Sequence, residues 1–327
     1  MSIKIYRQNA LSGTASPPTT LNYGEIACDK DGKIYSSNEE DVIVEQMNTT
    51  KYAYVGNPNL GTNTNFLNVV NQRKGETYMA STGNSIYAID RWRISGATYT
   101  VNTHTLTAPS YAARSCGMWQ SNEMGAHQLS IGDDVTVSIY ANGKLHTPTM
   151  KVIDRDLYDA FANVPASYDC DDFEIVLCTY ARDKTKYNLG IYPKKSLTVN
   201  YIKWEKGSAA TPYVPKNYSL ELAECQRYFY YLDSTKWYQC DCILGWGVIF
   251  TVHLAVPMRV IPTLNTVGTA KVFTSDGWTN VTSIKGTNNF IDKSVVSFLI
   301  TISDDVYNNN IGNALMITGV DSLTADL

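Results

Sequence analysis

The chain contains 327 residues, 44% of them apolar and 11% aromatic, with 27 basic against 31 acidic side chains and a net charge of −4. This composition supplies enough apolar material for packed cores, which excludes disorder along the whole chain, and the length predicts two domains or slightly more. A slightly acidic protein offers no basic surface for nucleic acid, and no apolar run approaches the ~18 residues that span a bilayer. The first residues lack the apolar stretch of a signal peptide, so we do not expect secretion by that route.

Tyrosine and cysteine usage indicates a β-rich protein made in a reducing compartment. The 23 tyrosines far outnumber the 8 phenylalanines, and tyrosine suits half-exposed sheet surfaces. The seven cysteines are an odd number and contain no Cys-x-x-Cys spacing, while the four histidines are scattered. We therefore expect buried free thiols, no zinc site and synthesis in a cytoplasm.

The first 50 residues differ from the rest and predict an extended arm. Pro17 and Pro18 cannot lie inside a helix or a central strand. Residues 23–28 and 33–36 flank Asp31-Gly32, which is a strong hairpin signal. A lone two-stranded hairpin is marginally stable in water, so we expect the arm to order against a partner surface or, alternatively, against its own chain.

Residues 51–217 carry the pattern of an all-β sandwich. Val135, Val137 and Ile139 alternate with polar residues, whereas 173–180 is apolar enough for a fully buried strand. Gly132-Asp133 and Asn142-Gly143 are turn signals, and one helical turn is expected within 154–161. The pattern predicts a single jelly-roll β-sandwich with strands near 85–94, 99–107, 134–141, 173–180 and 197–204.

A second β-rich region follows a connector at 207–217 that contains Pro212 and Pro215. Ser219 is placed to cap a short helix over 220–225, with Glu221 near its positive end. Strands are expected near 248–256 and 294–302, with turns at 276–277 and 303–305. The predicted fold class of the whole chain is therefore all-β. It is expected to have three parts: an N-terminal arm (1–50), a jelly roll (51–217) and a distal β domain (218–327).

Several segments resemble the tail-fibre and receptor-binding proteins of bacteriophages, in the same order along the chain. Residues 59–73, which begin Asn59-Leu60-Gly61, resemble the opening of their carbohydrate-binding-module-like jelly roll, and 87–92 resemble its next strand. Residues 202–207, with 211–215 after them, resemble the closing strand and exit of that module, and the matching segments 221–229 and 256–263 follow. The resemblance covers most of residues 20–265.

This resemblance implies a structural virion fibre protein that attaches to a host-surface glycan. It implies a homo-oligomer, most often a trimer, that contacts other virion proteins of the tail, baseplate or capsid after synthesis in the host bacterial cytoplasm. A head fibre or a capsid-decoration protein of the same modular type is the alternative. Residues 21–27 resemble the virion-anchoring start of such proteins, and the attachment residues would be Pro17, Pro18, Tyr23, Gly24 and Glu25.

Carbohydrate-binding modules of this kind stack sugar rings on flat aromatic side chains, while amides and carboxylates bind the hydroxyls. Trp119, beside Gln120 and Asn122 in a segment rich in glycine and polar residues, is the predicted stacking residue; a buried or subunit-facing role is the alternative. Trp278, next to the 276–277 turn in the distal domain, is a second glycan candidate, with a packing role as its alternative. Two tryptophans in predicted core strands are expected to pack instead: Trp92 and Trp204.

No motif in the chain supports catalysis. Asp169, Asp171, Asp172 and Glu174 form an acidic cluster, and a solvated loop is its simplest interpretation. Glycosidases need two carboxylates about 5–9 Å apart, and calcium needs six to eight oxygen ligands, but the cluster lacks the EF-hand spacing. The nucleophile-elbow, P-loop, His-Glu-x-x-His and Rossmann motifs are absent from the sequence. We expect a non-enzyme without cofactors, with a structural calcium ion and a capsule depolymerase as the remaining alternatives.

Overall fold

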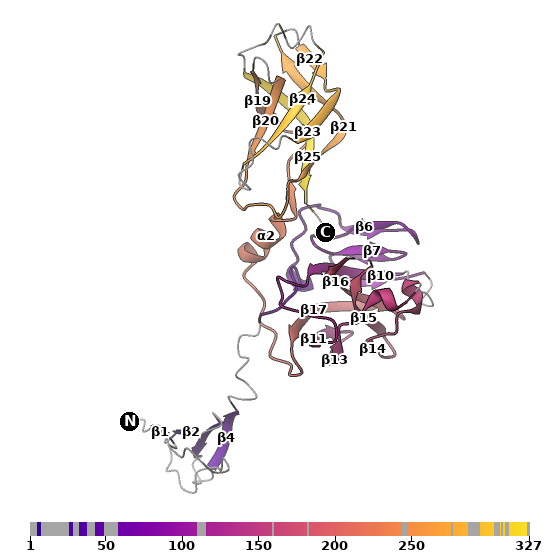
Figure 1. Ribbon diagram of the computed structural model, residues 1–327, viewed down its shortest axis with the longest axis vertical. Coiled ribbons are helices and arrows are strands. Elements are labelled where there is room, and N and C mark those ends of the chain that lie inside the picture. Colours follow the sequence, from indigo (N-terminus) through magenta and orange to yellow (C-terminus); the bar gives the residue numbers. More distant parts are fainter. Residues whose placement is uncertain are drawn as a thin grey trace.

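The computed structural model describes most of the chain from residue 58 onward, together with the backbone of four strands in the first 57 residues. From residue 58 it describes 58–109, 116–158, 160–181, 183–243, 247–275, 277–286, 295–303, 308, 310 and 314–325. The described chain is built of antiparallel sheets with one parallel pair, between β1 and β2, and a single α-helix, so the predicted all-β class is confirmed. Figure 1 shows a β-sandwich and a second sheet domain joined through helix α2.

The N-terminal strands form one small sheet in the order β1-β2-β3-β4. Strands β2 (Ile26–Cys28) and β3 (Lys33–Ser37) make the predicted hairpin, with Ile26 opposite Ser36. The hairpin is not alone, contrary to expectation, because β1 (Ile5–Arg7) adds to β2 in parallel and β4 (Ile43–Asn48) adds to β3. A four-stranded sheet meets more of its backbone hydrogen-bonding needs than a bare hairpin. The predicted attachment residues lie outside the described residues: Pro17, Pro18, Tyr23, Gly24 and Glu25.

The sandwich consists of two sheets that enclose one apolar core. The first sheet has the order β14 (Tyr168–Asp169), β15 (Phe173–Tyr180), β16 (Asp183–Pro193), β10 (Gly117–Glu123), β7 (Arg93–Ser95) and β6 (Ser85–Tyr87). The second has the order β12 (Lys144–His146), β11 (Asp134–Ala141), β17 (Leu197–Lys206), β9 (Thr105–Thr107), β8 (Thr98–Thr100) and β5 (Thr77–Met79), with β13 (Thr149–Lys151) on the free part of β11.

Two indole rings occupy the centre of this core, as the sequence predicted. Trp92 and Trp204 are fully buried, with ring centroids 6.1 Å apart and planes at 82°. The Trp204 indole N–H donates to the Tyr187 hydroxyl at 2.9 Å, so its polar atom is paired inside the core. Gly61 lies against the same indole, and a Cβ at that position would come within 2.3 Å of the ring. Only glycine fits there without moving Trp204.

Two predicted strands are hairpins instead, and the central strand β10 is among the strands that were not predicted. The stretch 85–94 bends at Arg91 (φ 71°) to give β6 and β7, and 99–107 bends at His104 (φ 53°) to give β8 and β9. Neither bend contains the glycine that marks most left-handed turns, so the pattern alone did not show them. Strand β10, at 117–123, pairs with both β7 and β16 in the middle of its sheet. The one helical turn predicted within 154–161 corresponds to a 3₁₀ turn at 155–157, and a second 3₁₀ turn follows at 161–163.

His127 and Trp204 both hydrogen-bond the Tyr187 hydroxyl inside the sandwich. Protonation of His127 should lower the free energy of unfolding of the sandwich in acid. Its Nδ1 shares a hydrogen bond with the Tyr187 hydroxyl at 2.6 Å. Burial, and secondarily the charge of Arg91, lowers the pKa of His127 from 6.5 to about 4. Between these two pH values the unfolded chain binds a proton that the folded chain does not, so stability present above pH 6.5 is lost as the pH falls toward 4.

Denaturant titrations from pH 7 to pH 4 measure this loss, which we expect to be roughly 2–3 kcal/mol for this group. His127→Gln keeps a side chain that can bond the Tyr187 hydroxyl but cannot titrate, and its stability should fall less over the same interval. Equal slopes for the wild type and His127→Gln would contradict the assignment.

The second domain begins with the connector and helix α2 (Tyr218–Gln226). The helix cap is Asn217, whose side-chain oxygen accepts from the Ser219 backbone N–H at 2.9 Å, so the prediction of Ser219 as the cap was wrong by two positions. Asparagine forms this cap as readily as serine. No helix in the described part of the chain is long and apolar enough to cross a membrane.

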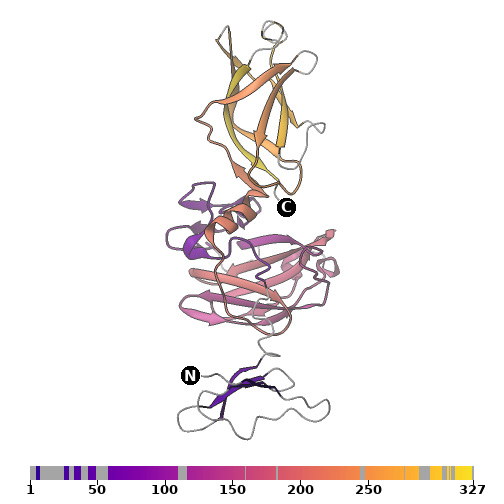
Figure 2. The same cartoon turned by 90° about the vertical axis from the view of Figure 1, so that its left-hand side faces the viewer.

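The C-terminal sheet curls around its own core of buried side chains (Figure 2). The predicted strand 248–256 corresponds to β20, and 294–302 to β24. The strand order is β22 (Gly277–Asn280), β21 (Thr263–Thr274), β25 (Ala314–Thr324), β19 (Tyr238–Ile243), β20 (Gly247–His253), β24 (Val295–Thr301) and β23 (Ser283–Gly286), with β18 (Phe229–Tyr231) also paired to β25.

The junction between the two domains is a set of specific polar contacts. Asn63, in the sandwich, donates its backbone N–H to the carboxylate of Glu221 in α2, and burial raises the pKa of that carboxyl. Three cations of the sandwich lie over aromatic rings of the 228–231 segment: Arg73 over Phe229 (3.8 Å), Lys74 over Tyr231 (3.9 Å) and Arg91 over Tyr228 (3.6 Å), each measured to the ring centroid.

Candidate functional site

The three residues predicted to form a glycan site around Trp119 all lie on strand β10, and the strand places Trp119 on one face of its sheet and the two amides on the other. Because β10 is a central strand and not a loop, Gln120 and Asn122 face the interior and are buried. The Gln120 amide donates to the Thr62 carbonyl at 2.6 Å and accepts from the Thr62 N–H at 3.0 Å, and the Asn122 oxygen accepts from Arg91. Both amides hold the protein's own chain in place, and neither is presented to a ligand.

Trp119 points to the opposite side of the same sheet and is partly buried. Its strand neighbours are Arg93 on β7 and Gly190 on β16, and Tyr87 on β6 pairs with Arg93 in turn. The Arg93 guanidinium lies 5.0 Å from the Tyr87 ring centroid. Trp119 is therefore part of a cross-sheet row with a cation and a second aromatic ring, and not with the two amides predicted beside it.

Trp278 lies in a group of exposed apolar side chains on the C-terminal sheet. Trp278 is 42% exposed, Phe273 44%, Trp237 59% and Met316 38%. The Trp278 ring centroid lies 5.5 Å from that of Trp237 and 5.1 Å from that of Phe273, with planes at 74° and 60°. We call these four residues the Trp278 patch. Soluble proteins seldom gather so many large apolar groups on one surface without a use for them.

Strand register brings the Trp278 patch together from distant parts of the sequence. Phe273 pairs with Trp278 across the β21–β22 hairpin, and Met316 on β25 pairs with Phe273 on its other side. Trp237 directly precedes β19, the next strand of the sheet. The hairpin turns at Gly277, whose φ of 106° suits glycine, while Asp276 lies outside the described residues. Strand β22 is at the end of the domain that lies away from the sandwich (Figure 1).

Polar side chains border the Trp278 patch on the same face of the sheet. Gln239 pairs with Met316, and Lys271 pairs with Asn280 at positions next to Phe273 and Trp278. All three of these polar side chains are exposed. Rings set at steep angles give both flat faces and edges for stacking, and amide and ammonium groups can bind hydroxyls beside them. This combination suits a ligand that has apolar faces and a polar edge.

The sequence identified only part of this surface. Trp278 was predicted as a site residue, but Trp237, Phe273 and Met316 were not. The signal available was the hairpin: Thr274 pairs with Gly277, and Phe273 and Trp278 are the next pair outward, so they face each other across two strands. Trp246, another aromatic residue of this region, lies outside the described residues.

The acidic cluster is arranged as ion pairs on the sandwich surface. Lys194 pairs with Asp169 and lies 3.8 Å from Glu174, and Lys195 pairs with Asp172 at 2.5 Å. The hydrogen bond from Lys195, followed by that from Asn142, lowers the pKa of Asp172. Within the described residues no three His, Cys, Asp or Glu side chains are close enough together to hold a metal ion.

Comparisons of the chain with protein-family models, with curated protein sequences and with solved structures gave no significant match.

Proposed function

We propose that this chain is a bacteriophage virion fibre protein and that its C-terminal domain attaches the particle to a glycan on the host surface. The observation that carries the proposal is the Trp278 patch, in which exposed rings are bordered by amide and ammonium groups on one face of a rigid sheet. Sites built on strands hold such a geometry better than loops do. The resemblance of several segments to phage fibre proteins supports the same conclusion.

The order of the domains fits a fibre of this kind. The N-terminal sheet would join the virion, the sandwich would form the body, and the Trp278 patch would face the host from the far end of the second domain. In a homotrimer three weak sites would act together, and linked sites raise avidity by about 10²–10⁴ without any new contact. Trp119, Arg93 and Tyr87 would give each subunit a second surface on the sandwich for host or virion contacts.

Replacing Trp278 with alanine tests the proposal. We expect affinity of the full chain for purified surface polysaccharide of the host strain to fall at least about tenfold, because the variant loses the indole that contacts both other rings of the patch. Trp278 is 42% exposed, so stability should change by less than about 1 kcal/mol. Biolayer interferometry with immobilised polysaccharide and a thermal melt measure the two quantities.

Tyr180→Ala is the matched control, because Tyr180 is 41% exposed and lies on the sandwich. It should bind polysaccharide as the wild type does. Polysaccharide binding by Trp278→Ala at the wild-type level, or an equal loss in both variants, would contradict a role for the Trp278 patch in attachment.

A further inference from the structure

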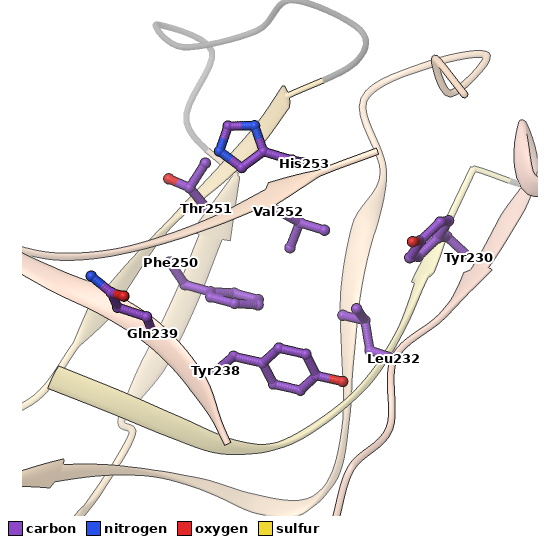
Figure 3. Close-up of a pocket in the computed structure, with 8 residues that line it drawn as sticks. All are labelled: Tyr230, Leu232, Tyr238, Gln239, Phe250, Thr251, Val252 and His253. Atoms are coloured by element: carbon purple, nitrogen blue, oxygen red, sulfur yellow. The ribbon is translucent and has the colours of Figure 1, made fainter. Parts of the chain in front are cut away.

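A hollow of about 300 Å³ opens beside the Trp278 patch, where strands β19 and β20 separate. The two strands are paired from Cys240 and Phe250 to Ile243 and Gly247. Toward the other end, Tyr238 and Gln239 diverge from the 251–253 segment, and the space between them forms the hollow (Figure 3). A volume of this size is at the small end of ligand pockets, which suits a single sugar residue better than a long ligand.

The floor of the hollow is apolar and its rim is polar. Phe250, Leu232 and Val252 are at most 8% exposed, and Figure 3 shows the Phe250 ring and the Leu232 side chain pointing into the space. The Tyr238 hydroxyl is already used, since it accepts from the Asp233 N–H at 2.7 Å. The exposed side chains at the rim are the amide of Gln239 and the imidazole of His253.

The rim of the hollow and the Trp278 patch lie on the same outer face of the sheet. Gln239 lines the hollow and pairs with Met316, which pairs with Phe273, which pairs with Trp278. Three strand spacings of about 4.8 Å therefore place the hollow about 14 Å from β22 along this row. A chain-like ligand lying on the Trp278 patch would reach the hollow with a residue further along the chain.

We propose that the hollow binds an N-acetylated sugar residue of the glycan that lies on the Trp278 patch. An acetamido group has a methyl that can fill the apolar floor and an amide that needs both a donor and an acceptor. Gln239 provides both in one side chain. A plain hexose would leave the floor unfilled and would give Gln239 only hydroxyls. This inference rests on the proposed glycan attachment and adds the class of sugar to it.

Saturation-transfer NMR with the full chain tests the inference, using N-acetylglucosamine and N-acetylgalactosamine as probes and glucose and galactose as comparison sugars. We expect the strongest saturation at the acetyl methyl protons and little signal from the plain hexoses. Gln239→Ala should weaken binding of the N-acetylated sugars at least tenfold. Gln239 is exposed, so the fold should be retained. Asp241→Asn changes the next outward-facing position of β19, which does not line the hollow, and should bind as the wild type does.

The outcomes separate this inference from the proposed function. If host polysaccharide binds in a Trp278-dependent manner but the N-acetylated sugars do not bind, or bind equally well to Gln239→Ala, the hollow is not an acetamido site and glycan attachment stands. If neither the polysaccharide nor the N-acetylated sugars bind, both proposals fail. Trp278→Ala should still bind the free N-acetylated sugars, because their site is the hollow.

Discussion

Replacing Trp204 with alanine is expected to lower the free energy of unfolding of the sandwich by roughly 3–5 kcal/mol. The side chain is fully buried, packs edge-on against Trp92 and donates to the Tyr187 hydroxyl. The substitution would open a cavity at the centre of the core and would remove the donor that Tyr187 now accepts from. Gly61, which has no side chain to fill the space, borders the same indole.

Urea denaturation followed by tryptophan fluorescence and circular dichroism measures this loss. Trp204→Phe is the graded control: it keeps an aromatic ring but not the N–H, and should lose clearly less stability than the alanine variant. The comparison with Trp278→Ala is equally informative, since an exposed indole should cost little stability. A loss below about 1 kcal/mol in Trp204→Ala would contradict the central role of this indole.

The strands that the sequence predicted best are those whose own side chains show a clear hydrophobic pattern. Val135, Val137 and Ile139 alternate and are all buried, and the structure has β11 at the predicted residues. The 173–180 strand is likewise correct because its apolar run is long enough to exclude a loop. In both strands, local hydrophobicity and the tertiary environment favour the same conformation.

Strand β10 was missed because its buried side chains are polar. Gln120 and Asn122 carry the signature of a surface loop, and only the structure provides the backbone groups and the arginine that pair with them. Such partners are distant in the sequence: Thr62 precedes Gln120 by 58 residues. A pattern read along one segment cannot show which distant groups pair with Gln120 and Asn122. The prediction that these two amides contact a glycan was made without that information.

The Trp278 patch was predictable only in part for a related reason. Its members come from three separate parts of the sequence, namely Trp237, the 273–278 hairpin and Met316, and they share a face only because of strand register. Register depends on turn geometry and on which strands are neighbours. In this sheet the order is β22-β21-β25-β19, and one sequence alone does not show which of these strands pair. Hence the sequence predicted only Trp278, and the order and register of the strands determine which other side chains form a surface with it.

The position of the Trp278 patch relative to the sandwich depends on the junction between the two domains. Arg73 is central there: its guanidinium lies 3.8 Å from the Phe229 ring centroid and 4.8 Å from that of Tyr87, and it forms an ion pair with Asp90 at 2.9 Å. The Asp90 side chain is 1% exposed. The Gln72 amide donates to the Phe229 carbonyl at 2.9 Å beside it. One side chain thus joins both domains to a buried charge.

Arg73→Ala should therefore destabilise the protein and uncouple its two domains. Removing one partner of a buried ion pair costs about 3–5 kcal/mol, and loss of the cation over Phe229 adds about 1 kcal/mol. Because these contacts cross the junction, the wild type should melt in a single calorimetric transition, whereas the variant should show two, with the sandwich melting first. Differential scanning calorimetry of the full chain measures both the shift and the separation.

Arg93→Ala is the matched control, because Arg93 also lies over the Tyr87 ring, at 5.0 Å, and its hydrogen bond to the Ser85 hydroxyl stays within the sandwich. It should cost less than about 1 kcal/mol and keep one transition, since its contact is that of a half-buried cation–π pair that does not cross the junction. A second variant, Phe229→Leu, keeps an apolar side chain at the junction but removes the ring, and should separate the transitions with a smaller loss of stability than Arg73→Ala. If Arg73→Ala still melts in one transition at the wild-type temperature, the domains are held together by contacts other than this one, and the Trp278 patch would keep its orientation without Arg73.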